Sequence, residues 1–191
     1  LGTLALGRGV DPYGALASLG AARGFVAGSE VRSYGVPVGF RSGSPEGVVV
    51  RRAVHDGDVT AVTLHVAATW PHLSDEVARA LDHGTCHVAV LAGPGSEVPG
   101  PTPVDEVRVV GIGCHSVTRA GWVGPLVVVP ARRRQGTGLA LLGRICRDLM
   151  IAELPEAHVP AVDDPGVDAF LLSAGAGPRV TRHRMHKDLG S

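Results

Sequence analysis

Arginine and glycine residues that suit anion binding lie close together late in this 191-residue chain. The stretch runs Val127-Val-Val-Pro-Ala-Arg-Arg-Arg-Gln-Gly-Thr-Gly-Leu-Ala-Leu-Leu142, which predicts a β-branched strand, a stop at Pro130, a cationic turn and an apolar helix. The first turn of a helix has unpaired backbone N–H groups and a partial positive charge, so it binds phosphate readily. Gly136 and Gly138 let the backbone approach an anion, and the arginines at 132–134 add cationic donors. The stretch is therefore predicted to bind a phosphate or pyrophosphate.

Two other glycine motifs that bind nucleotides fit this stretch less well. A P-loop needs Lys and Ser or Thr after its last glycine, but Leu139 and Ala140 stand there. A dinucleotide fingerprint needs a third glycine three residues after Gly138, and that residue is Leu141. An ordinary strand-to-helix turn with solvated arginines stays open as the alternative.

The stretch resembles the acyl-CoA signature of the GCN5-related N-acetyltransferases, Q/R-x-x-G-x-G/A. Arg133, Gly136 and Gly138 fill its three fixed places. The resemblance implies acetyl-CoA or another acyl-CoA as co-substrate, with the strand before the turn pairing with the pantetheine arm. The cofactor-binding residues that it implies are Val127, Val128, Val129, Arg133, Arg134, Gln135, Gly136, Thr137 and Gly138.

The resemblance also implies direct transfer of the acyl group from CoA to an amine of a small molecule or peptide. This sequence departs from the family in its acid–base residues. Residues 122–129 hold no carboxylate where many members have a glutamate base, and Leu171 stands where many have a tyrosine that protonates the thiolate. A catalytically silent acyl-CoA-binding module, acting as a sensor or partner domain, is therefore the alternative from a different functional class.

Other residues are candidates for the missing acid and base. His115 is the substitute base, because imidazole titrates near neutral pH, with a structural histidine as the alternative. Asp163 and the adjacent Asp164 are predicted to hold a cationic substrate or act as base, with a turn and helix cap as the alternative. Ser173 or water is left to protonate the thiolate. Cys114 is interpreted as a small buried thiol rather than an acyl carrier.

The elements that must position these residues are read from apolar periodicity and from glycine and proline breaks. The expected order is strand, two helices, three strands, helix, strand, helix, strand. It predicts an α/β fold with a mixed, mostly antiparallel central sheet flanked by helices, as in the acetyltransferase family. Asp56-Gly-Asp58 is predicted to cap the first helix. Strands are expected at 47–52, 87–91, 107–113, 122–129, 157–162 and 179–187, and helices at 59–70, 73–81, 137–149 and 168–174.

Glycine and proline are dense at 41–47 and 93–103, which predicts a domain break and a long hairpin loop. The break divides the chain into an N-terminal segment, 1–45, and an acyltransferase domain, 46–191. The N-terminal segment is expected to form a helix from Asp11-Pro12 and a strand at 29–38. It is either an added helix and strand or the remnant of a preceding acetyltransferase-like half.

Composition narrows the range of partners. The formal net charge is zero, which argues against nucleic acid and against an anionic membrane surface as ligands. No apolar run is long enough to span a bilayer. Three scattered cysteines fit a reducing cytoplasm, and no grouping of His, Cys and Asp along the chain has metal-ligand spacing, so no metal is predicted. A homodimer is the oligomeric state to test.

Overall fold

The structure of the protein is a computed structural model, which describes residue 19 and residues 21–92 and 108–186. Its described residues form two antiparallel sheets, with strand orders β2-β3-β4-β5 and β6-β1-β7. The strands are β1 Val26–Pro37, β2 Val48–Arg52, β3 Cys86–Leu91, β4 Val109–His115, β5 Val123–Val128, β6 Glu156–Val162 and β7 Gly177–His186. The helices are α2 Asp56–Thr69, α3 Ser74–Asp82, α4 Thr137–Ile151 and α5 Pro165–Ser173, with 3₁₀ turns η1 Pro71–Leu73 and η3 Pro130–Arg132. The predicted mixed α/β fold with an antiparallel sheet flanked by helices is confirmed.

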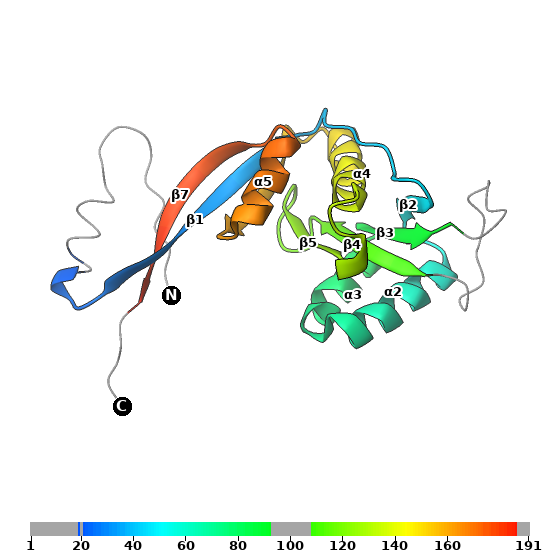
Figure 1. The fold of residues 1–191 in the computed structure, drawn as a ribbon, viewed down its shortest axis with the longest axis horizontal. Coiled ribbons are helices and arrows are strands. Elements are labelled where there is room, and N and C mark those ends of the chain that lie inside the picture. The colour runs from blue at the N-terminus through cyan, green and yellow to red at the C-terminus, as the bar shows by residue number, and fades with distance from the viewer. Residues whose placement is uncertain (1–18, 20, 93–107, 187–191) are drawn as a thin grey trace.

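The four-stranded sheet is covered on both faces. Figure 1 shows α4 on one face and α2 and α3 on the other. All seven residues of β4 are buried, and so are five of the six in β3. Strands that lie between two helical layers are expected to be apolar on both sides, which explains the continuous valine-rich runs. The core of the domain therefore lies on both sides of this sheet.

Two glycines let α4 lie close to β4. A Cβ added to Gly111 would lie 3.2 Å from Leu141 Cδ1, and one added to Gly113 would lie 3.2 Å from Ile145 Cδ1. Both contacts are shorter than most Cβ contacts, so side chains at these two positions would push the helix away. The glycines thus fix the distance between α4 and the sheet.

The second sheet is built around a strand from the N-terminal segment. β1 pairs antiparallel with β6, with Tyr34 opposite Val159, and with β7, with Arg32 opposite Thr181. In Figure 1, β1 and β7 form a long two-stranded ribbon beside α5. A strand from segment 1–45 is therefore the middle strand of a sheet shared with segment 46–191. Most of the helix predicted from Asp11 lies outside the described residues.

Several predicted boundaries shift in the structure. The prediction that Asp56-Gly-Asp58 caps α2 is wrong, because the helix begins at Asp56 and its N-cap residue, His55, makes no side-chain cap hydrogen bond. Asp58 is 2% exposed and accepts two 2.8 Å hydrogen bonds from Arg51, so an ion pair replaces the cap. β4 ends at His115, which is therefore a strand residue rather than one that follows the strand. The loop predicted at 93–103 lies outside the described residues.

The residues that the structure describes bear on the predictions about cysteines and membrane spans. Cys86, Cys114 and Cys146 are free and buried. Within the residues that the structure describes, no helix is both long and apolar enough to cross a membrane.

Candidate functional site

The two sheets meet at one point and then separate. β5 and β6 lie side by side, and among the described residues they are linked by one isolated parallel bridge, between Trp122, just before β5, and His158 of β6. The His158 N–H donates to the Gly121 carbonyl at 2.8 Å, and the two rings lie 5.3 Å apart. Beyond this point β5 pairs only with β4 among the described strands. β5 is therefore an edge strand whose open side has backbone groups that can bind an extended ligand.

A pocket of about 240 Å³ lies where the sheets meet. Most of its walls come from the start of β5 and the loop before it, and Glu76 enters from α3 on the other side. Glu76 is the only carboxylate among the residues that line the pocket, and it is partly buried. The full lining is Glu76, Val117, Thr118, Trp122, Val123, Gly124, Pro125 and Pro160.

The predicted anion-binding turn lies at the far end of β5. Gly136 is the N-cap of α4, with φ of 88°, and no atom lies within 4 Å of the place that a Cβ would occupy. A left-handed conformation of this kind favours glycine. Arg133 Nε donates to the Val128 carbonyl at 3.0 Å, which holds the turn against the end of the strand. The structure therefore brings the residues predicted at 127–129 and 133–138 to one place.

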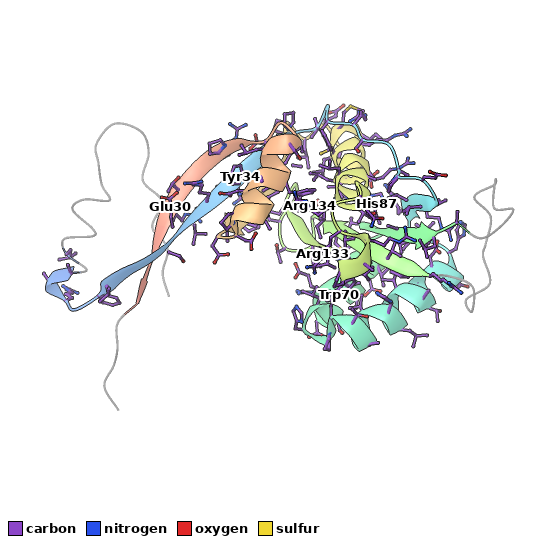
Figure 2. All side chains as sticks on the ribbon, in the orientation of Figure 1. Glu30, Tyr34, Trp70, His87, Arg133 and Arg134 are labelled. Atoms are coloured by element: carbon purple, nitrogen blue, oxygen red, sulfur yellow. The ribbon has the colours of Figure 1, made fainter. Side chains whose placement is uncertain are left out.

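The start of α4 gathers several groups that can donate hydrogen bonds to an anion. Thr137 is buried, and its Oγ1 has no hydrogen-bond partner among the described residues. The side chains of Arg133, Arg134 and Gln135 are exposed beside it, and Figure 2 shows the two arginines in the turn between β5 and α4. A buried hydroxyl, free helical N–H groups and exposed guanidinium groups together form a cationic donor set for an anion.

The predicted acid and base residues have mostly structural contacts. Asp164 caps α5, since its Oδ1 accepts from the N–H groups of Gly166 at 2.7 Å and Val167 at 2.9 Å. Asp163 is exposed at the end of β6. Ser173 is exposed and its hydroxyl donates to the Phe170 carbonyl at 2.7 Å. None of Asp163, Asp164 and Ser173 is among the residues that line the pocket.

The predicted base His115 lies on a different face of the sheet from the pocket carboxylate. Its ring is 6% exposed, and its Nε2 lies 3.4 Å from Asp148 Oδ2 on α4. Glu76 belongs to α3, which covers the opposite face. The neighbouring residue Cys114 points to that opposite face, where it packs with residues of α2 and α3. The structure therefore does not bring His115 and the pocket together.

Cys114 has the properties of the buried thiol that the sequence favours. A hydrogen bond with Cys86 and burial raise its pKa well above the usual range, and the charge of Glu76 adds to this shift. A thiol that stays protonated is a poor nucleophile. The structure thus supports a packing role for this side chain.

Asp148 is the centre of a partly buried polar network that the sequence analysis missed. Its Oδ2 accepts from Arg52 Nη2 at 2.5 Å and lies 2.9 Å from His87 Nε2 as well as 3.4 Å from His115 Nε2. Burial alone raises the pKa of this carboxyl, but hydrogen bonds from the two histidines and the charge of Arg52 outweigh it and hold the pKa well below its usual range. Asp148 is therefore ionised at neutral pH.

The contacts of Ser116 indicate the proton positions in His115. Ser116 Oγ accepts from the Gly121 N–H at 3.1 Å and lies 3.1 Å from His115 Nδ1. Because the ionised Asp148 carboxylate can only accept hydrogen bonds, Nε2 is the ring nitrogen that carries a proton toward it, and a ring with one proton then accepts from the Ser116 hydroxyl at Nδ1. The ring proton of His115 then lies on Nε2 and faces Asp148.

One of the missed residues carries a sequence signal. Leu141, Ile145 and Asp148 follow one another at i, i+4 and i+7, so a charged residue interrupts the apolar stripe of α4. A charge in that position indicates a buried partner. Glu76 carries no such signal, since an acidic residue in the first turn of a helix is ordinary.

Comparisons with known proteins place this arrangement of strands and helices in a known fold. No protein-family model matches the chain, and a search of curated proteins finds no match. Solved structures do match. The GCN5-related glucosamine N-acetyltransferase region of a fungal multi-domain GH3 β-N-acetylglucosaminidase has a TM-score of 0.66 and 11% identity over 93% of this chain and 23% of that one.

Two further matches are acetyltransferase-like proteins of greater overall length than this chain. A GCN5-related N-acetyltransferase from Sphaerobacter thermophilus has a TM-score of 0.61 and 19% identity, over 90% of this chain and 54% of that one. A tandem protein of the same fold, from the clavulanic acid biosynthesis pathway, has a TM-score of 0.58 and 16% identity over 96% and 60%. The chain thus has the fold of the GCN5-related N-acetyltransferases and spans less than two thirds of the length of these three structures.

Proposed function

We propose that this protein is an acyltransferase that moves an acetyl or other acyl group from CoA to an amine of a small molecule or peptide. The observation that carries the proposal is the layout along β5. A cationic turn with a left-handed glycine lies at one end of this edge strand, and a pocket with one carboxylate lies at the other. That layout suits a long thioester with a diphosphate at one end and a reactive carbonyl at the other.

The turn supplies the binding groups for the diphosphate. We assign this role to Arg133, Arg134 and Gln135, with the backbone N–H groups of Gly136, Thr137 and Gly138. Val127, Val128 and Val129 supply the open backbone edge for the pantetheine arm. Gly138 is packed against Phe170 of α5, since a Cβ there would lie 3.3 Å from the phenyl ring. A larger residue at 138 would therefore have to displace the Phe170 ring.

In the proposed reaction the amine nitrogen attacks the thioester carbonyl, an amide bond forms, the C–S bond breaks and CoA leaves as a thiol. An ammonium acceptor must lose one proton before attack, and the second amine proton goes to the departing sulfur. Glu76 is the carboxylate that lines the pocket, so we propose it as the base and as the group that attracts the ammonium. A backbone N–H of β5 is proposed to stabilise the oxyanion.

His115 and Asp163 remain candidates from the sequence, but their surroundings favour them less. The Nε2 proton of His115 faces Asp148, and Asp163 is outside the pocket lining. Water is the most direct proton donor to the sulfur, because the Ser173 hydroxyl is engaged with the Phe170 carbonyl.

A silent acyl-CoA-binding module is the second candidate function. The observation that favours it is Leu171, which is 1% exposed and packs in the core. Many family members have a tyrosine at this position that protonates the departing thiolate, and leucine cannot do so. Such a module would keep the turn and the open strand edge while lacking turnover.

Calorimetric titration with acetyl-CoA, followed by assay of amide products with a panel of primary amines, separates these functions. Saturable binding and product formation with at least one amine are expected. Binding without product across the whole panel would favour the silent module. If the protein binds neither acetyl-CoA nor CoA, both proposals are contradicted. Size-exclusion chromatography of the same sample tests the predicted homodimer.

A further inference from the structure

Three side chains of types that can ligate a metal ion converge on the α4 face of the sheet, opposite the face of Glu76. His87 comes from β3, His115 from β4 and Asp148 from α4. One ligand atom from each lies within 4.8 Å of the others. The histidine residues are 3% and 6% exposed, and Figure 2 shows His87 on the α4 side of the sheet. The convergence depends on the fold, since His87 and Asp148 are 61 residues apart in the chain.

The spacing of these atoms fits a small tetrahedral cation. Zinc binds histidine nitrogen and carboxylate oxygen at roughly 2.0–2.2 Å, which places neighbouring ligand atoms about 3.3 Å apart. The two Nε2 atoms lie 2.9 and 3.4 Å from the same Asp148 oxygen. The imidazole rings are nearly parallel, with an angle of 23° and centroids 6.0 Å apart, and both Nε2 atoms face the same Asp148 oxygen. The three ligand atoms lie within 4.8 Å of one another, so the side chains must draw together to close a ligand triangle.

The charge around Asp148 also suits a cation. The carboxylate is 13% exposed, and Arg52 supplies the nearest formal positive charge. Arg52 is itself 46% exposed, so its guanidinium can turn into solvent when another cation takes its place. Coordination through Nε2 moves the His115 ring proton to Nδ1, where Ser116 Oγ lies 3.1 Å away and accepts it.

We propose that His87, His115 and Asp148 bind one divalent transition-metal ion, with Zn²⁺ as the ion that this ligand set favours. Two imidazoles and a carboxylate leave a fourth position for water, toward the side where Arg52 lies. The ion joins β3 and β4 to the C-terminal half of α4 and so stabilises the fold, on the face of the sheet opposite Glu76. The inference is independent of the proposed function.

Cobalt and zinc titrations of metal-free protein test the site. Co²⁺ in a nitrogen and oxygen tetrahedral site gives visible absorption, which reports geometry and not only affinity. We expect one Co²⁺ per chain with such a spectrum, displacement by Zn²⁺, and a rise in Tm with either ion. His115→Ala and Asp148→Asn should weaken binding by roughly a hundredfold or more, because changes to residues that only support ligands already cost tenfold or more.

Two further variants keep the test decisive if Asp148→Asn folds poorly. Arg52→Gln removes the competing guanidinium and should strengthen metal binding, whereas a network of hydrogen bonds alone would gain no metal from this change. The double variant His72→Gln, His83→Gln removes two exposed imidazoles and should leave binding unchanged. Absence of Co²⁺ absorption and of a Tm shift in both the unchanged protein and Arg52→Gln would overturn the proposal. So would equal affinity in the His115→Ala variant.

Discussion

The two ends of α4 are built in opposite ways. Its N-terminal end is made of neighbours in the chain, from the valines of β5 through the arginine turn to Gly136. Its C-terminal end gathers Asp148 with Arg52, His87 and His115, which come from three different strands. The first end is exposed and cationic, and the second is partly buried and centred on a carboxylate. One helix thus connects a site encoded locally to a site that exists only after folding.

The largest expected effect is at the N-terminal end. Gly136→Val should abolish detectable CoA binding, because a β-branched residue resists the φ of 88° and a side chain there projects toward the diphosphate. Gly47→Val is the matched control, since Gly47 also has a positive φ and open space at its Cβ. Both variants should lose about 1–2 kcal/mol of stability, but only the first should lose affinity by calorimetry. Loss of affinity in both would show that the effect is general strain and not a local contact.

At the C-terminal end the expected effect is on stability and not on ligand binding. Asp148→Asn in metal-free buffer should lower the free energy of unfolding by roughly 1–3 kcal/mol, because three neighbouring side chains lose a charged acceptor. Urea unfolding measures this change, and calorimetry on the folded fraction should give nearly unchanged CoA affinity. Equal loss of CoA affinity and stability would show that the two ends of α4 do not act separately.

The sequence predicts the locally built end well and the other end poorly. The motif around Gly136 and the helix that starts at Thr137 follow from contiguous residue types, and both are present in the structure. The position of β1 between β6 and β7 does not follow, because strand partners depend on pairing between distant segments. The Asp148 network is missed for the same reason, although a charge on the apolar stripe of α4 was a visible signal.

The pocket is partly local in sequence and partly formed by folding, because it combines residues in and around β5 with one side chain from α3. Glu76→Gln should lower kcat/KM for an amine acceptor by about a hundredfold, the usual contribution of a positioned base. Asp75 precedes Glu76 in the same helix turn and is exposed, so Asp75→Asn should leave kcat/KM nearly unchanged. CoA affinity should hold in both variants. If Glu76→Gln keeps full activity while His115→Ala loses it, then His115, on the α4 face of the sheet, is the better candidate for the base.

The smallest expected effect concerns the junction of the two sheets, where His158 contacts Trp122. Burial is the largest cause that lowers the pKa of His158 below its ordinary value, with nearby arginine charges adding to the shift and Glu156 opposing it. The unfolded chain then binds this proton more readily than the folded protein. The contribution of His158 to stability is therefore complete above the reference pKa of about 6.5 and is lost as pH falls below it.

His158→Gln should remove part of the fall in stability between pH 7 and 5, as followed by urea midpoints at several pH values. Burial also lowers the pKa of His65, so His65→Gln should remove a separate part of the same fall. His158 contacts Trp122, which lines the pocket, whereas His65 contacts Trp70, which does not. Only the His158 variant should therefore also alter the pH dependence of acceptor binding. Identical pH profiles for His158→Gln and the unchanged protein would show that the sheet junction does not sense protonation. The pH dependence would then arise outside the place where β5 and β6 meet.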